Sequence, residues 1–204
     1  MEGNLEKLEE RIITKDMKSV IEKIESSTCE IIKDNNSGTG FICQIKFKGL
    51  NLRSLLTSFH VISEKDLKKN IKIKLNEKMI ELNMKLNRKI FYYKNIGYTC
   101  IEILNEDNIK DNIVEINEDI KIIDYVPKGK NESDISSNKI LEYSHGRIEY
   151  IDDDKCYYDC NINQGCSSGA IISIKTTKII GLHLRYEENK NWGVCGSDII
   201  KDIH

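Results

Sequence analysis

The stretch "QGCSSGAIISIKTTKIIGLHL", from Gln164 to Leu184, decides the fold class of this chain. Its first part, around Ser167, is rich in glycine and serine, which is typical of a tight turn. Two isoleucine-rich runs follow, with the polar residues KTTK between them, as in a β-hairpin. The stretch therefore predicts strands, and not a helix, directly after Ser167.

Short runs of the same kind occupy most of the chain. They are rich in Ile, Tyr and Val, and Gly, Asn, Asp and Lys separate them. The runs are "TCEIIK", "TGFICQIKF", "RSLLTSF", "IKIKL", "RKIFYY", "TCIEIL", "IKIIDYV", "KILEYSHGRIEYI", "GAIISI", "KIIGLHL" and "WGVCGSDII". Many strands at short spacing predict an all-β domain over residues 28–204, either a barrel or a sandwich. The polar segment 105–119 is expected to link a first half, 28–104, to a second, 120–204.

In the first 27 residues the apolar residues are spaced differently from those of the strands. Apolar residues recur there at helical spacing, with Glu and Lys between them, over residues 4–25. We expect an amphipathic helix, interrupted around Lys15–Asp16, in an N-terminal helical extension, 1–27. Two interpretations stay open: the helix packs on the domain that follows, or it serves docking of a partner or dimerisation.

Composition excludes several classes of partner. Charged residues make up 31% of the 204 residues but leave a net charge of only −2, so neither nucleic acid nor an anionic membrane is an expected partner. No apolar run resembles a signal peptide or a membrane span, and the seven cysteines are scattered and odd in number. We therefore expect a cytoplasmic protein with reduced thiols. Cys156 and Cys160 lack a second ligand pair, so we expect no metal and no cofactor.

The pentapeptide GCSSG also matches G-x-S-x-G, the nucleophile turn of α/β-hydrolases. That turn must open a helix, whereas a β-branched run follows Ser167. An acid and then a histidine should also follow the serine, and too little chain remains to hold the intervening units. We reject that fold.

Three stretches carry the candidate chemistry: "SGTGFICQI", "RSLLTSFHVIS" with His60, and "NQGCSSGAIIS" with Ser167. A serine needs an imidazole to take its proton and donors to hold the oxyanion. Gly165 tolerates the dihedral angles of a turn that would aim the amides of residues 165 and 167 at one point.

These stretches resemble a known family. "GTGFI…LLTSFHVI" and "NQGCSSGAIISIKTTKIIGLHL" resemble, in order and in spacing, the two signatures of chymotrypsin-fold, trypsin-like serine peptidases. The glutamyl-endopeptidase and heat-shock peptidase branches are the most similar. The resemblance covers about residues 28–200 and implies a double six-stranded antiparallel β-barrel with the active site between the barrels.

The resemblance also implies roles for individual residues. His60 would be the general base and Ser167 the nucleophile that forms an acyl-enzyme, with the amides of Gly165 and Ser167 as the oxyanion hole. His183 falls where some branches carry a histidine of the S1 pocket, which suggests Glu or Gln at P1. The alternative for His183 is a histidine satisfied within a barrel strand. Leu184 and Arg185 would join His183 in contacting the peptide or protein substrate.

The chain departs from the family where the triad acid should stand. In "IGYTCIEIL" that position holds Gly97, and neither Glu102 nor Asp107 has the right spacing to replace the acid. Ser168 stands where the family usually has glycine, and its side chain is expected to crowd the turn.

Three classes of function follow from this pattern. The first is a serine endopeptidase that uses His60 and Ser167 as a dyad or recruits an unidentified carboxylate. The second is a pseudopeptidase that binds a peptide or protein partner. The third is a β-rich interaction module whose motifs are accidental.

Overall fold

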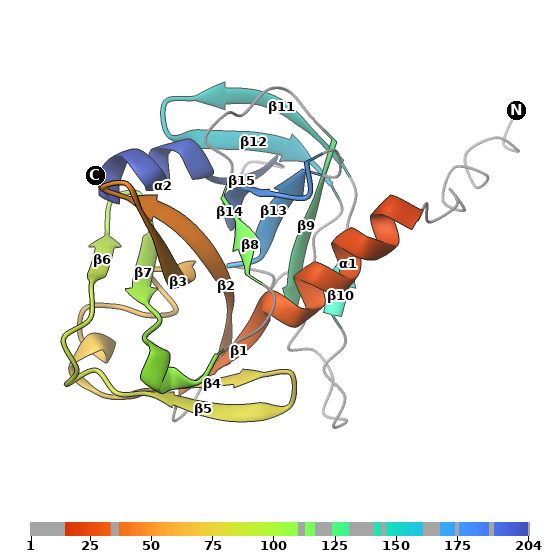
Figure 1. Cartoon of the computed structure of the whole chain (residues 1–204). Coiled ribbons are helices and arrows are strands. Elements are labelled where there is room, and N and C mark those ends of the chain that lie inside the picture. Colours follow the sequence, from red (N-terminus) through yellow and green to blue (C-terminus); the bar gives the residue numbers. More distant parts are fainter. Residues whose placement is uncertain are drawn as a thin grey trace, which may run out of the picture.

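The computed structural model describes residues 15–33, 37–109, 113–116, 124–130, 141–143, 146–160, 168–173, 176–187 and 190–203. For 15–20, 124–130, 141–143 and 187 it describes the backbone alone. Strands dominate, and they form two antiparallel sheets that lie against each other (Figure 1). The predicted all-β class is confirmed.

The first sheet is built from the N-terminal half of the chain. Its order is β5-β4-β1-β2-β3-β7-β6, and β8 pairs in parallel with β2. Residues 83–89 connect the two edge strands of this order, β5 and β6. The strands are β1 (Thr28–Ile32), β2 (Ser37–Phe47), β3 (Leu50–Ser58), β4 (Ile71–Leu75), β5 (Lys78–Leu82), β6 (Ile90–Tyr93), β7 (Tyr98–Glu102) and β8 (Val114–Glu115).

The second sheet contains seven strands in the order β10-β9-β11-β12-β15-β14-β13. An additional pairing of β9 with β13 closes six of them, all but β10, into a ring. The strands are β9 (Asp124–Lys130), β10 (Leu141–Tyr143), β11 (Gly146–Asp152), β12 (Lys155–Asp159), β13 (Ala170–Ser173), β14 (Ile179–Glu187) and β15 (Lys190–Cys195).

The first sheet thus contains eight strands and the second seven, six of which close into a ring. The predicted linker 105–119 also contains β8, which adds to the first sheet beside β2. One residue beyond β8, Ile116 forms an isolated bridge with Ile179 of the second sheet. Residues 114–116 of the predicted linker thus pair with both sheets, and the apolar side chains of Val114 and Ile116 are buried in the shared core.

The first sheet contributes side chains to two different cores. Successive residues of a strand point to opposite faces. On β2, Phe41 and Cys43 belong to the core that both sheets share, whereas Ile42 belongs to the interior of the first sheet. On β3, Leu56 likewise belongs to the shared core and Leu55 to the interior of the first sheet. Both faces of these strands are therefore covered, which explains their uninterrupted apolar runs.

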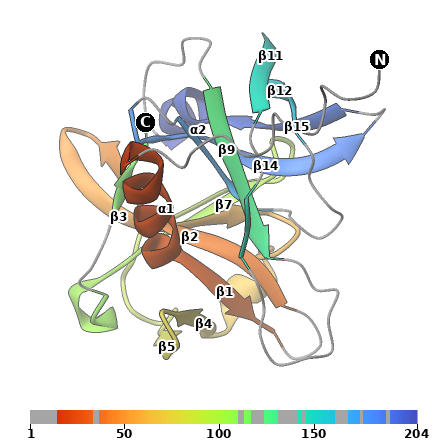
Figure 2. The same cartoon turned by 90° about the vertical axis from the view of Figure 1, so that its right-hand side faces the viewer.

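Two α-helices flank the sheets, α1 (Lys15–Ser27) and α2 (Gly196–Ile203). Helix α1 packs against β2 and β8, and Figure 2 shows it in front of β2. Its residue Ile24 is 1% exposed within the shared core. The rest of the expected helix, residues 4–14, lies outside the described residues, and a docking role stays a prediction.

Helix α2 corrects the sequence analysis. The run "WGVCGSDII" was expected to be a strand throughout, but β15 ends at Cys195 and a helix begins at Gly196. Ile199, Ile200 and Ile203 follow helical spacing and are buried in the shared core. This burial outweighs the low helix propensity of the β-branched residues.

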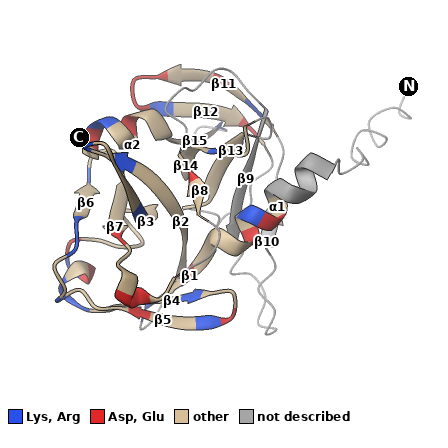
Figure 3. Ribbon diagram, viewed as in Figure 1, with Lys and Arg blue, Asp and Glu red and all other residues tan. Residues whose placement is uncertain are grey.

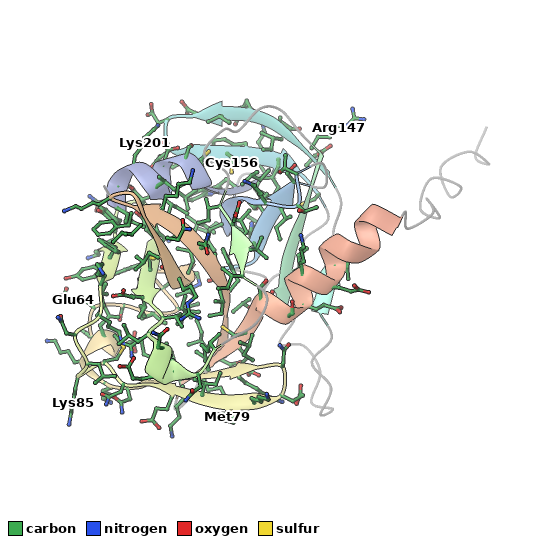
Figure 4. All side chains as sticks on the ribbon, in the orientation of Figure 1. Glu64, Met79, Lys85, Arg147, Cys156 and Lys201 are labelled. Carbon is green, nitrogen blue, oxygen red and sulfur yellow. The ribbon has the colours of Figure 1, made fainter. Side chains whose placement is uncertain are left out.

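Positively and negatively charged residues both occur on the outer strands in the ribbon of Figure 3. Met79 and Lys85, labelled in Figure 4, project from the edge of the first sheet, whereas Cys156 lies inside the second. No disulfide joins the six cysteines in the described part of the chain, and no group of three or more potential metal ligands occurs there. None of the described helices is long and apolar enough to span a membrane.

Candidate active site

His60 lies in the turn that follows β3. The carbonyl oxygen of Ser58, the last residue of the strand, accepts hydrogen bonds from the amides of Val61 and Ile62, both at 3.1 Å. Val61 packs against Gly38, where a Cβ atom would approach Val61 Cγ1 to 2.4 Å. The first glycine of "SGTGF" therefore has a structural reason: it lets β2 approach the turn that presents His60. His60 lies at the surface, with its imidazole partly buried.

The charges that act on His60 are positive. Partial burial lowers the pKa of His60, and the Arg185 guanidinium and the Lys33 ammonium lower it further. Lys33 is held in place by the Val61 carbonyl oxygen at 2.8 Å and by Asp66 at 3.0 Å. Within the described residues, the hydrogen-bond partner of His60 is a hydroxyl: Ser58 Oγ lies 3.4 Å from Nε2. The imidazole is consequently neutral at physiological pH.

The nucleophile candidate Ser167 and the oxyanion candidate Gly165 lie outside the described residues, so their predicted roles stay predictions. The description resumes at Ser168, and two backbone bonds tie this point to β14: Ser168 N donates to His183 O at 2.9 Å, and His183 N donates to Gly169 O at 2.8 Å. Strand β13 begins at Ala170. A strand, not a helix, follows the serine turn, which supports the rejection of the α/β-hydrolase turn.

Ser168 is buried and hydrogen-bonded to the other sheet. Its backbone has a φ angle of 71°, in the left-handed region. Its Oγ accepts a hydrogen bond from Ser58 N at 3.0 Å and lies 2.5 Å from Ser58 Oγ. The hydroxyl therefore has partners in the other sheet, whereas the left-handed φ angle is one that glycine adopts more readily.

The position expected for the triad acid is closed. Gly97 has a φ angle of 104°, which side chains rarely adopt, and a Cβ atom there would lie 3.1 Å from Leu184 Cδ1. Its carbonyl oxygen accepts a hydrogen bond from the amide of Phe59, at 2.7 Å. An aspartate at this place would meet an apolar side chain and an unfavourable backbone conformation.

The two nearby acids are engaged elsewhere. Glu102 accepts from the Lys89 amide at 2.7 Å and pairs with its ammonium at 3.2 Å. Asp107 forms a buried bidentate ion pair with Arg88, at 3.0 and 3.1 Å, and accepts from the amide of Leu104. In the described part of the chain, no carboxylate is hydrogen-bonded to His60.

The three expected substrate-binding residues follow one another on β14. His183 is 3% exposed, and its Nδ1 is hydrogen-bonded to the hydroxyl of Tyr158. Burial, with a smaller contribution from His60, lowers the pKa of His183 to about 4, so this imidazole is neutral as well. Leu184 is buried against Gly97, whereas Arg185 is exposed.

Two contributors to this arrangement are absent from the sequence analysis. Ser58 is a polar residue at the end of an apolar strand, two positions before His60, and this spacing could have placed it on the same side of the chain. Tyr158 gave no such signal, because its partner His183 is 25 residues away in sequence.

The fold is similar to solved structures of proteases. The inactive form of the Rv3671c protease from M. tuberculosis H37Rv matches with a TM-score of 0.65 and 14% identity, covering 90% of each chain. Deg5 matches with a TM-score of 0.67 and 14% identity, covering 95% of this chain and 94% of that one. No family model matches the sequence, and no curated protein matches it significantly.

These structural neighbours are trypsin-like serine proteases. The predicted chymotrypsin-like fold is confirmed at this level, without a preference for one branch of the family.

Proposed function

We propose that this chain is a serine endopeptidase in which His60 and Ser167 act as a dyad, without the carboxylate of a triad. The observation that carries the proposal is the contact between the sheets. Ser58, two residues before His60, bonds through its amide to Oγ of Ser168, the residue after Ser167. This bond supports the proposal, because each of its two residues lies within two positions of the candidate base or the candidate nucleophile in sequence.

The chemistry needs only these two side chains and backbone donors. Ser167 Oγ attacks the carbonyl carbon of the scissile peptide bond, and its proton passes to His60. The amides of Gly165 and Ser167 hold the oxyanion. The C–N bond then breaks, the leaving amine takes the proton from His60, and an acyl ester remains on Ser167. Water, deprotonated by His60, attacks the ester carbonyl carbon; the bond to Ser167 Oγ breaks, His60 returns the proton to that oxygen, and the carboxylic acid is released.

The positive surroundings of His60 set the expected rate. They keep the imidazole neutral and able to accept a proton, but they stabilise the imidazolium less than a carboxylate does. Disabling the aspartate of the serine peptidase triad costs about 10⁴ in turnover in the family's worked case. We accordingly expect a slow peptidase.

His183 supports a preference at P1 within the same proposal. When Tyr158 donates its hydroxyl proton to Nδ1, the neutral ring carries its own proton on Nε2. Such a donor suits the carboxamide oxygen of glutamine. We propose Gln, ahead of ionised Glu, as the preferred P1 residue.

A second candidate function rests on Gly97 and Leu184. Because Leu184 fills the space next to the acid position, the site is a packed structure and not one that has merely lost a side chain. Such a site fits a pseudopeptidase that holds a peptide or protein partner without cleaving it.

Reaction with a fluorophosphonate probe, measured by intact mass, separates these candidates. We expect the wild type to gain one label, Ser167→Ala to gain none, and His60→Gln to react far more slowly. Ser173→Ala, which removes a buried serine hydroxyl elsewhere on β13, is the matched control and should react like the wild type. A folded wild type that stays unlabelled beside an active trypsin-like control would reject the peptidase and favour the binding protein.

A further inference from the structure

Four side chains form a row across the outer face of the second sheet. The cross-strand partners are Tyr150 and Tyr157, Tyr157 and Trp192, and Trp192 and Arg185, on β11, β12, β15 and β14. Paired residues of neighbouring strands share a face of the sheet. This face is the outer one, because Tyr158, next to Tyr157 on β12, belongs to the core inside the second sheet. We call these four paired residues the outer row.

Two β-bulges place the ends of the outer row on this face. The register shifts between Ile148 and Tyr150 on β11, and again between His183 and Arg185 on β14. Residues two apart on a regular strand share a face, so Tyr150 would otherwise point inward with the buried Ile148. Arg185 would likewise point inward with the buried His183. Bulges that re-aim a side chain are common next to functional sites, and this sheet uses two of them to complete one row.

The rings of the outer row form an apolar platform with cations above it. Tyr150 is 42% exposed, and its ring stacks on that of Tyr157, with centroids 4.5 Å apart and an interplanar angle of 16°. The Lys190 ammonium lies 4.8 Å from the centre of the Tyr150 ring, and the Lys155 ammonium lies 4.9 Å from that of Trp192. Trp192 also packs against the shared core, which holds this end of the platform in place.

The positive charges of the platform are compensated at one end only. Lys190, over Tyr150, pairs with Glu149 at 3.7 Å. At the other end, Lys155 lies over Trp192, and Arg185 is the cross-strand neighbour of Trp192. Among the described residues, neither of these two cations takes part in an ion pair. A complementary partner therefore carries apolar rings for the platform and a carboxylate for the Trp192 end.

The place of Arg185 indicates which molecule would carry these groups. Leu184, the residue before it, packs on Gly97. The carbonyl oxygen of Gly97 in turn accepts a hydrogen bond from the amide of Phe59, the residue before His60. The outer row therefore begins beside the candidate base and leads away from it over the second sheet. A polypeptide held at His60 would continue along the row.

A nucleic-acid strand fits the same face less well, although bases do stack on aromatic side chains set among cations. Besides Lys155, Arg185 and Lys190, the four strands and the β11–β12 turn carry only one cation, Arg147. Their acids are more numerous: Glu149, Asp152, Asp153, Asp154, Asp159 and Glu187. A chain of phosphates would meet this negative excess along its whole length, whereas one carboxylate meets only the cations at Trp192.

We propose that the outer row binds the part of a polypeptide partner that extends beyond the residues held at His60, and that it selects aromatic side chains followed or preceded by one carboxylate. Neighbouring strands are about 4.8 Å apart, so the row is about 14 Å long, and an extended peptide spans it with about four to five residues. The placement of the partner rests on the proposed function, but binding to the row is measured without catalysis.

Trp192 is the single tryptophan of the chain, so its fluorescence reports on the outer row directly. The probes are three end-capped peptides, Glu-Gly-Phe-Gly-Phe, Lys-Gly-Phe-Gly-Phe and Glu-Gly-Ala-Gly-Ala, with excitation where tryptophan alone absorbs. We expect the first peptide to shift the Trp192 emission. The lysine and alanine peptides should bind about 10-fold more weakly, because they lack the carboxylate or the rings.

Variants locate the binding on the row. Tyr150→Ala should weaken the first peptide about 10-fold, and Arg185→Gln should reduce the difference between the glutamate and lysine peptides. Tyr186→Ala is the matched control: this tyrosine is 57% exposed on the same strand as Arg185, but it pairs with Asn191 and so belongs to the other face. The Tyr186→Ala protein should bind like the wild type.

The outcomes separate the outer row from the peptidase. Peptide binding with these preferences by a protein that the fluorophosphonate probe leaves unlabelled would keep the row and reject the peptidase alone. If all three peptides bind equally, or if none changes the emission or the indole N–H resonance of Trp192, the inference is overturned, whether or not Ser167 is labelled. Tighter binding of a short oligothymidylate than of the first peptide would overturn it as well, in favour of a nucleic-acid strand.

Discussion

Replacing Gly97 by aspartate restores the missing acid in the sequence, but we do not expect it to increase the reactivity of Ser167. The change restores the residue type that the resemblance demands. The structure, however, gives that residue a φ angle of 104° and places Leu184 Cδ1 3.1 Å from the new Cβ atom. The variant is therefore expected to be less stable than the wild type and no more reactive at Ser167.

The expected loss of stability in Gly97→Asp has two contributions. A side chain held at such a φ angle costs about 1–3 kcal/mol, and Gly97→Ala should show this cost together with the Leu184 contact. Gly97→Asp should lose about 1 kcal/mol or more beyond Gly97→Ala, because its carboxyl group would lie unpaired against a buried leucine.

Equilibrium urea unfolding measures both variants, and probe labelling measures reactivity. Gly49→Ala is the matched control. Gly49 also has a positive φ angle, 78°, but no atom lies within 4 Å of a Cβ built there. The difference between Gly97→Ala and Gly49→Ala therefore reports the contact with Leu184. A Gly97→Asp protein that is as stable as the wild type and labels faster would contradict this prediction, since it would show that the turn can accommodate a triad acid.

Three further predictions follow from buried charges and from the two histidines. Arg88→Ala leaves Asp107 unpaired in the interior and should lower the free energy of unfolding by about 3–5 kcal/mol, measured in urea; a loss below 1 kcal/mol would contradict the buried pair. Folding lowers the pKa of His183 from 6.5 to about 4, so the unfolded chain takes up a proton at a higher pH than the folded chain does. The neutral His183 therefore contributes about 3 kcal/mol to the free energy of unfolding. This contribution is fully present above pH 6.5 and is lost as the pH falls toward 4. Unfolding at a series of pH values should show that loss, and His183→Phe should lack it. Arg185→Gln removes a charge that lowers the pKa of His60, so the acid limb of the labelling profile should move to higher pH; an unmoved limb would mean that Arg185 does not act on the base.

Much of the fold could be predicted because strand signals are local. Alternation such as Ile71, Lys72, Ile73 identifies a half-buried strand from neighbouring residues alone. The order of the His60 and Ser167 stretches then indicated the chymotrypsin-like fold, which the structural neighbours confirm. Helix α2 was not predicted because its isoleucines favour strands locally. The helix is stabilised by their packing into the shared core, which involves residues distant in sequence.

The candidate site, too, could be predicted from the sequence only in part. The residue types follow from the sequence alone: a histidine and a serine in family order, and Gly97 where the acid should be. The contacts of Leu184 with Gly97, of Tyr158 with His183 and of Ser58 with Ser168 depend instead on how the chain folds. Each of these contacts joins residues at least 25 positions apart, and Ser58 and Ser168 are 110 apart. Local patterns carry no information about such pairs, because their distance is set by how the two sheets pack.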